Sequence, residues 1–152
     1  MAVIERSARV PYSADQMLAL VNDIDSYPEF LHWCHGARIE KDSGAVVDAA
    51  LEIGISGIYK TIRTRNTTTR EASTGPASVQ IEMLEGPLKT LHGYWKLIDQ
   101  PEQRCDIQLR LEYEIHRSPF GLLLRSLFDE IANSQLNAFV KRARAVYGER
   151  LD

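Results

Sequence analysis

The feature that most constrains this fold is the order of its hydrophobic patterns along the chain. About a hundred residues with strand-like alternation come first, and residues 118–152 then form one long amphipathic segment. Its apolar residues recur at three- and four-residue spacing, which predicts a helix of about 30 residues and about 45 Å. The expected core positions of this helix are Phe120, Leu123, Leu124, Leu127, Phe128, Ile131, Ala138, Phe139 and Val146.

Strand patterns fill most of the chain before this helix. Residues 2–10 alternate and predict a first strand. A helix is expected next, because Ser13 and Gln16 have the spacing of a capping box, and a second short helix or turn is expected over residues 25–31. Further strands are expected around residues 37–41, 47–55, 59–65, 79–83, 91–97 and 107–115, with turns at Gly57, Gly75-Pro76 and Gly86-Pro87.

The order of these elements predicts a single α+β domain over residues 1–152. Strands joined by short turns form hairpins, so the sheet is expected to be antiparallel. A helix of about 45 Å can bury its apolar stripe only along the concave side of a curved sheet. Such an arrangement can enclose a cavity for an apolar molecule.

Composition narrows the class of protein further. The net charge of −3 leaves no overall basic surface for nucleic acid, so no DNA partner is expected. The charged N-terminus predicts no signal peptide, and no apolar run approaches the ~20 residues of a membrane span. Cys34 and Cys105 do not make a disulfide framework. We therefore expect a cytoplasmic protein with reduced thiols, with peripheral contact to the inner membrane as an alternative.

Two segments resemble a known family. Residues 25–34 read DSYPEFLHWC, and residues 85–97 read EGPLKTLHGYWKL. Together with the order of elements, they resemble the coenzyme-Q-binding START-like domain family of the polyketide cyclase/dehydrase superfamily, over essentially the whole chain. Two positions depart from the family pattern: His32 stands where a proline is usual, and Leu88 where an aromatic residue is usual.

The resemblance implies a helix-grip fold of START/Bet v 1 type, with six or seven strands around the long helix. It also implies a cavity that carries ubiquinone or a similar lipid in support of respiration, with no cofactor required. One bacterial branch, the ribosome association toxins, implies binding to the large ribosomal subunit and a block of subunit association. The superfamily includes cyclases, so an enzyme is a third alternative, although the family has no invariant catalytic set to carry across.

A ligand cavity in such a fold would have an apolar lining. Phe30 and Trp33 are expected to cap one end of it, although the same aromatic residues could instead attach a loop to the core. A mostly apolar lining suits a ligand site, but it suits a filled core equally well. The predicted lining is Phe30, Trp33, Leu91, Trp95, Leu109, Leu111, Tyr113, Leu124, Leu127, Phe128 and Ile131.

Motifs for metal binding and catalysis are weak. His32, Cys34 and His35 lie close in sequence but lack the helical pairing of metal ligands, so no metal site is predicted. Residues 54–57 are one residue short of a Gly-x-Ser-x-Gly elbow, and no phosphate-binding loop is present. No catalytic residue is therefore predicted.

Basic side chains form two local groups. They could contact RNA phosphates or anionic lipid head groups, although cations at the end of a helix also suit its dipole. His92 and Tyr94 are expected on the face of their strand opposite Trp95, in solvent. The first basic group is Lys60, Arg63, Arg65 and Arg70, and the second is Lys141, Arg142, Arg144 and Arg150.

Overall fold

The computed structural model describes residues 1–55, 57–70, 72 and 75–150. The strands form one antiparallel sheet in the order β1-β7-β6-β5-β4-β3-β2. The strands are β1 Ala2–Val10, β2 Cys34–Asp42, β3 Val46–Ile55, β4 Ile58–Arg70, β5 Ala77–Glu85, β6 Thr90–Gln100 and β7 Arg104–Glu114. The helices are α1 Ala14–Asn22, the 3-10 turn η1 Ile24–Ser26, α2 Tyr27–Phe30 and α3 Pro119–Tyr147.

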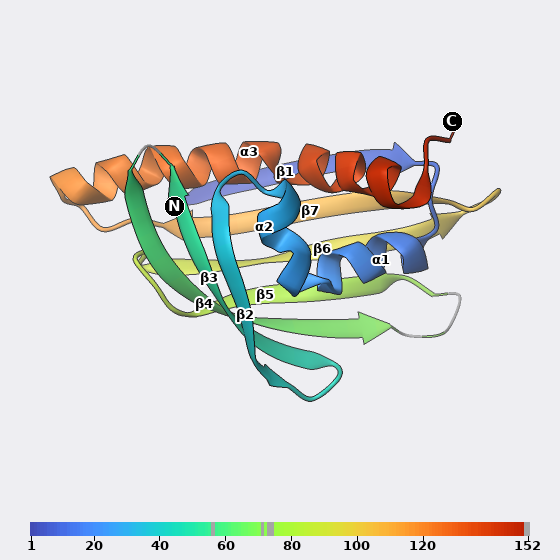
Figure 1. The fold of residues 1–152 in the computed structure, drawn as a ribbon, viewed down its shortest axis with the longest axis horizontal. Helices are drawn as coiled ribbons and strands as arrows, with labels where there is room; N and C mark the ends of the chain where they lie inside the picture. The colour runs from blue at the N-terminus through green and yellow to red at the C-terminus, as the bar shows by residue number, and fades with distance from the viewer. Residues whose placement is uncertain (56, 71, 73–74, 151–152) are drawn as a thin grey trace.

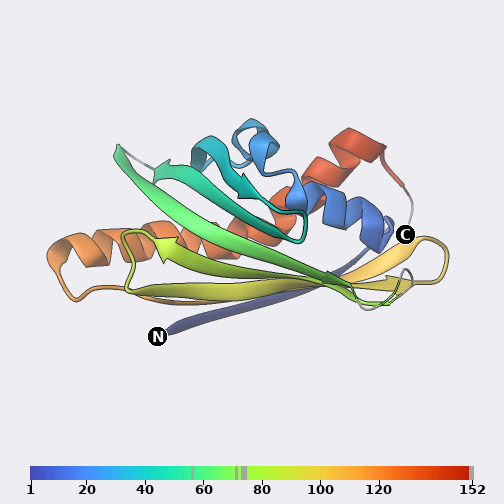
Figure 2. The same cartoon turned by 90° about the horizontal axis from the view of Figure 1, so that it is seen from below.

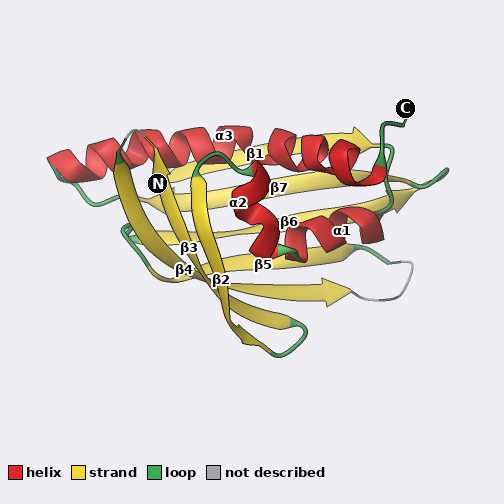
Figure 3. Cartoon of the chain, in the orientation of Figure 1, coloured by secondary structure: helices red, strands yellow, loops and turns green. Residues whose placement is uncertain are grey.

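The sheet curves around the long helix. Figure 1 shows α3 running along the strands β1, β7 and β6, and Figure 2 shows β2, β3 and β4 bending up on the same side of the sheet as the helix. The short helices α1 and α2 lie on that side as well, toward the C-terminal part of α3 (Figure 3). The predicted α+β class and helix-grip arrangement are confirmed.

Local sequence signals explain where the helices begin and end. The Ser13 hydroxyl accepts from the Gln16 backbone N–H, and the Gln16 side chain accepts from the Ser13 N–H, which completes the predicted capping box. At the start of α3, the Ser118 hydroxyl accepts from the Gly121 N–H at 2.9 Å. Gly148 ends this helix with φ 87°, a conformation that glycine adopts without strain.

The predicted apolar stripe of α3 is correct in the middle of the helix and wrong at its ends. Phe120, Leu123 and Val146 are 44%, 56% and 49% exposed. Figures 1 and 2 both show the first turns of α3 projecting beyond the ends of the strands, so these turns have no sheet to pack against. Small residues missed by the pattern are buried along the helix instead, namely Gly121, Ala132 and Ala143.

Candidate functional site

A cavity lies between the concave face of the sheet and α3. Its volume is about 90 Å³, well below the ~300–1,000 Å³ of pockets that hold drug-sized ligands. In this conformation it has no room for a complete prenylated lipid. The lining consists of Ile24, Tyr27, Trp33, Leu51, Ile53, Ile62, Thr64, Asn66, Ile81, Leu91, Trp95, Leu111, Tyr113, Phe128, Ile131, Ala132 and Gln135.

Strand alternation aims these side chains into the cavity. Every second residue of a strand faces the same side of the sheet, so β6 contributes Leu91 and Trp95, and β7 contributes Leu111 and Tyr113. The helix closes the opposite side with residues such as Phe128. Most of the predicted lining residues therefore face the cavity: Trp33, Leu91, Trp95, Leu111, Tyr113, Phe128 and Ile131.

Four predicted lining residues lie elsewhere. Leu109, Leu124 and Leu127 are buried in the core but do not line the cavity, because sheet and helix side chains fill the space around them. Phe30 packs edge-on against Phe139, with ring centroids 5.1 Å apart, and the Arg142 guanidinium lies 5.0 Å from the Phe30 ring centroid. Phe30 therefore attaches α2 to the C-terminal half of α3 and is not part of the cavity lining.

Three polar lining residues were missed from the sequence. Thr64 and Asn66 are buried on the concave face of β4, and Gln135 reaches the cavity from α3. On β4, Thr64 and Asn66 follow Ile62 at intervals of two residues, and all three are buried. This period-two spacing is the sequence pattern that could have placed Thr64 and Asn66 on the buried face of the strand. The rest of this strand is rich in threonine and charged residues, which hides this pattern in the sequence.

A tyrosine links the cavity wall to a carboxylate on the helix. The Tyr113 hydroxyl donates a hydrogen bond to the Asp129 carboxylate. Burial and then the nearby Asp129 raise the pKa of Tyr113 above its ordinary range, so the phenol is neutral. Its polar atom is already engaged, and its ring packs beside Phe128 at a centroid distance of 6.1 Å.

Comparison with known proteins identifies the family. The family described as polyketide cyclase / dehydrase and lipid transport matches residues 10–140. The chain belongs to this family. A ribosome association toxin RatA from Vibrio cholerae is 38% identical over 98% of this chain and 100% of its own length.

Two further similarities are more distant. The mitochondrial coenzyme Q-binding protein COQ10 homolog B from Xenopus laevis is 25% identical over 91% of this chain and 57% of its own length. The crystal structure of the Zhui aromatase/cyclase from Streptomyces sp. R1128 superposes with a TM-score of 0.80 at 15% identity, over 98% of this chain and 99% of that one. This last match shows the shared fold alone.

The family includes cyclases, so the chemistry available in the cavity matters. Among the described residues that line it, none is a carboxylate, an imidazole or an amine. Its polar groups are the hydroxyls and amides of residues such as Thr64, Asn66 and Gln135. These groups can orient a ligand by hydrogen bonds, whereas acid–base catalysis usually needs groups that titrate near the working pH.

The first predicted basic group is largely neutralised by neighbouring carboxylates. Asp48 lies opposite Arg65 in the register of β3 and β4, and the Arg65 Nε donates to Asp48 at 2.8 Å. That hydrogen bond holds the pKa of Asp48 below its usual range. In the same way, Arg63 contacts Glu40 and Glu85, Arg70 contacts Asp15 and Asp99, and the Lys60 ammonium lies 4.7 Å from the Phe120 ring centroid.

The second basic group is divided between packed and exposed side chains. Arg142 lies 3.6 Å from Glu29, and the Arg150 guanidinium lies 5.1 Å from the Tyr12 ring centroid. Lys141 and Arg144 are exposed on the last turns of α3. Only part of this group is therefore presented to solvent for an anionic partner.

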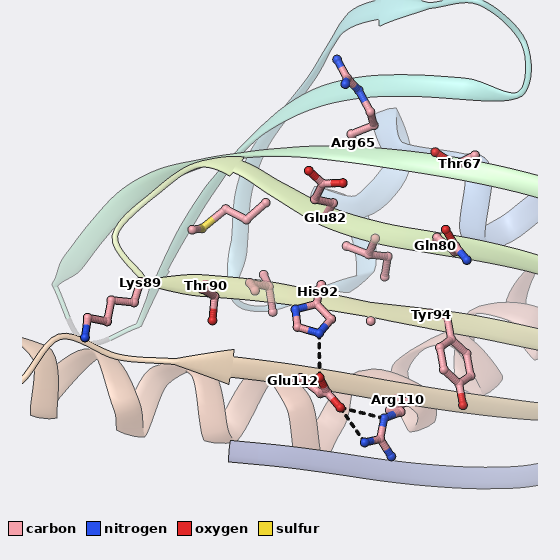
Figure 4. Close-up of a pocket in the computed structure, with 14 residues that line it drawn as sticks. Arg65, Thr67, Gln80, Glu82, Lys89, Thr90, His92, Tyr94, Arg110 and Glu112 are labelled. Carbon is pink, nitrogen blue, oxygen red and sulfur yellow. Dashed lines mark hydrogen bonds and ion pairs between the residues drawn. The ribbon is translucent and has the colours of Figure 1, made fainter. Parts of the chain in front are cut away.

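The outer face of the sheet carries a separate groove of about 700 Å³. Figure 4 shows His92, Arg110 and Glu112 linked across it, with Glu112 2.6 Å from the His92 Nε2 and 2.5 Å from an Arg110 nitrogen. The hydrogen bond from Arg110 is the main cause of a lowered pKa for Glu112. His92 lies on the outer face, as predicted, and the lining of this groove is mostly charged and polar. The lining of the internal cavity is mostly apolar, as in small-molecule sites, so we place the candidate site there.

The histidines and cysteine near α2 do not converge. The His32 Nε2 lies 3.2 Å from a Glu130 oxygen, while the His35 Nε2 lies 2.9 Å from the Gly54 carbonyl oxygen. Within the described part of the chain, no three His, Cys, Asp or Glu side chains are arranged to hold a metal ion. None of the described helices combines the length and the hydropathy needed to cross a membrane.

Proposed function

We propose that this protein associates with the ribosome in the cytoplasm and hinders the joining of the ribosomal subunits. The supporting observation is the 38% identity, over nearly the whole chain, to relatives named ribosome association toxin RatA in Vibrio cholerae and Escherichia coli. The large subunit is the expected partner. The match covers nearly the whole chain, so it includes the segments that form the cavity and those that form the outer surface.

One end of the molecule presents cations that no carboxylate neutralises. Lys60, Lys89 and Arg117 are exposed, and among the described residues none of the three has a carboxylate within 4.0 Å. Figure 4 shows Lys89 among the residues that line the groove on the outer face, just before β6. The contact of Lys60 with Phe120 and the 2.8 Å backbone bond from Lys89 to Glu114 bring these cations to the N-terminal end of α3. We propose that the cations at this end of the molecule contact the phosphates of ribosomal RNA.

Co-sedimentation with purified ribosomal subunits tests this function. The unmodified protein should bind the large subunit and lose affinity as salt rises, because released counterions contribute to phosphate binding. The triple variant Lys60→Glu, Lys89→Glu, Arg117→Glu should bind at least about tenfold more weakly. The control Arg6→Glu, Lys41→Glu, Lys96→Glu reverses as many exposed charges outside the two basic groups and should bind normally.

Three results would contradict parts of this proposal. No binding by the unmodified protein would exclude ribosome association, and normal binding by the first triple variant would exclude the assigned surface. Phe120, Leu122 and Leu123 are exposed at the same end, so a bilayer is the competing partner. Flotation with anionic vesicles, without binding to subunits, would indicate that partner instead.

A second candidate function is favoured by the cavity itself. We infer that the protein also binds an uncharged apolar molecule there, since the lining is neutral and mostly aliphatic or aromatic. Ubiquinone is one candidate, supported by the distant coenzyme Q-binding relative. The cavity of about 90 Å³ could hold the ring of ubiquinone, but the tail would enter only if the helix and the sheet separate.

Filling the cavity tests this second function. Ala132 is buried in the lining, so Ala132→Leu should remove the space and reduce bound ligand at least about tenfold. Ala145→Leu makes the same change at an exposed position of α3 and should have no effect. Native mass spectrometry and lipid extraction of protein from a ubiquinone-producing bacterium would measure the bound molecule. A protein that carries no ligand in any form would contradict this function.

A further inference from the structure

The cavity contains buried polar atoms that lack hydrogen-bond partners. Among the described residues, Trp33 Nε1, Asn66 Oδ1 and Gln135 Oε1 are buried without a partner, and all three residues line the cavity. Trp33 and Asn66 are only 4% and 8% exposed. Buried polar groups in proteins are nearly always paired, so three unpaired atoms at one cavity indicate a place for a partner.

The three atoms come from different parts of the fold. Trp33 precedes β2, Asn66 belongs to β4, and Gln135 belongs to α3. Their meeting is therefore a product of the tertiary fold and not of one local motif. An apolar residue at any of these positions would avoid the cost of burying an unpaired polar group, which makes a binding role the better explanation.

The donor and acceptor types define what could bind. An indole N–H only donates, so Trp33 requires an acceptor such as a hydroxyl or carbonyl oxygen. The oxygens of Asn66 and Gln135 accept, so they require a donor such as a hydroxyl group. The Tyr113 hydroxyl does not compete for these groups, because it donates to Asp129.

Charge and size define the rest of the ligand. The described lining contains no charged side chain, and moving an ion into such surroundings without a counterion is costly. The volume of about 90 Å³ suits a body of about one ring. The flanking lining residues include Trp95, Phe128 and Ile131, which suit an apolar ring.

We propose that the cavity binds an uncharged single-ring compound of the phenol class, whose hydroxyl accepts from Trp33 and donates its one hydrogen to Asn66 or to Gln135. The proposal rests on the second candidate function above and names the class of its ligand. The ring would occupy the apolar part of the cavity, and the hydroxyl would meet the polar atoms.

The test compares 4-methylphenol, toluene and 4-methylbenzoate, which share a ring and a methyl group. Both tryptophans of the chain line the cavity, so their two indole N–H signals in ¹⁵N-resolved NMR report its occupancy. 4-Methylphenol should bind about fivefold more tightly than toluene and shift the Trp33 N–H downfield. 4-Methylbenzoate should show no saturable binding.

Variants assign the preference to the polar atoms. The double variant Asn66→Leu, Gln135→Leu removes both acceptors and should retain toluene binding, which shows an intact cavity, and lose the preference for 4-methylphenol. Because the phenol is the better hydrated probe, it should bind this variant no more tightly than toluene does. The matched control Thr69→Val replaces a polar residue at an exposed position of β4 and should keep the preference.

The outcomes distinguish this proposal from the second candidate function, the binding of an apolar molecule, on which it rests. If toluene binds the unmodified protein as tightly as 4-methylphenol, the polar subsite is excluded and the apolar cavity remains. Tightest binding of 4-methylbenzoate would overturn the requirement for a neutral ligand. If none of the three probes binds, the ligand function of the cavity fails together with this proposal.

Discussion

At the scale of single residues, burial decides what each polar or reactive side chain can do. Burial raises the pKa of Cys34 to about 11 and that of Cys105 to about 12, so both thiols are protonated at neutral pH. Both cysteines are free, and their protonated form is a poor nucleophile. By contrast, the unpaired amide oxygen of Asn66 is an available acceptor in the cavity wall.

Replacing the Asn66 amide should raise the stability of the fold while it removes a hydrogen-bond acceptor for the ligand. Asn66→Leu removes a buried acceptor without a partner and keeps a side chain of similar size. We expect the free energy of unfolding to rise by about 1 kcal/mol, as a buried polar atom no longer loses its hydration. Urea unfolding followed by circular dichroism measures the change. A clear loss of stability would assign Asn66 a structural role instead.

At the scale of elements, strand pairing and helix length determine which side chains are exposed and unpaired on the surface. The register of β3 with β4 places Asp48 beside Arg65 and so removes a cation from the predicted basic surface. The 29 residues of α3 exceed the span of the sheet, which leaves Phe120 and Leu123 uncovered. Neither the pairing of Arg65 nor the exposure of Phe120 and Leu123 can be predicted from the sequence of its own strand or helix alone.

Strand β6 depends on a close approach at Gly93. A Cβ at this position would lie 2.1 Å from the Arg110 carbonyl oxygen and 3.0 Å from the Leu111 Cα, both backbone atoms of β7. Gly93→Ala should therefore push β6 from β7 and destabilise the protein by about 2 kcal/mol. Lys96→Ala, at an exposed position of the same strand, should be nearly neutral. Equal thermal midpoints for the two variants would disprove the steric argument.

At the scale of the whole molecule, charge pairs lie around the outer surface of the sheet. Arg9 contacts Asp106 at 2.7 Å, and Arg65 contacts Asp48 at 2.8 Å. Hydrogen bonds from these arginines lower the pKa of both carboxyls. Each pair joins two neighbouring strands, since Arg9 and Asp106 are partners in the register of β1 with β7, and Arg65 and Asp48 in that of β4 with β3.

These lowered pKa values predict the response of the fold to acid. A carboxyl with a lowered folded-state pKa stabilises the protein above its unfolded-state pKa, which is 3.8 for an aspartate, and loses that effect as pH falls through the folded value. Thermal midpoints should be level from pH 7 to about 5 and then fall below pH 4. High salt should reduce this dependence, because the pairs are exposed. A midpoint that is insensitive to pH down to 3 would contradict this account.

The sequence by itself determined the elements, their order and the family. Alternation along 107–115, the capping box at Ser13 and the long helical pattern after Ser118 are local signals, and local sterics and hydrophobic periodicity act within a few residues. The motif segments at residues 25–34 and 85–97 were sufficient to predict the superfamily, which the family match confirms.

Only the tertiary structure decided which of those residues meet. Phe30 packs against Phe139, the arginines Arg63 and Arg65 of β4 pair with carboxylates on other strands, and Asn66 and Gln135 line the same small cavity. Each outcome depends on strand register and on the seating of α3 against the sheet. These are long-range packing relations, and a pattern read along one segment carries no information about the partner that the fold places opposite.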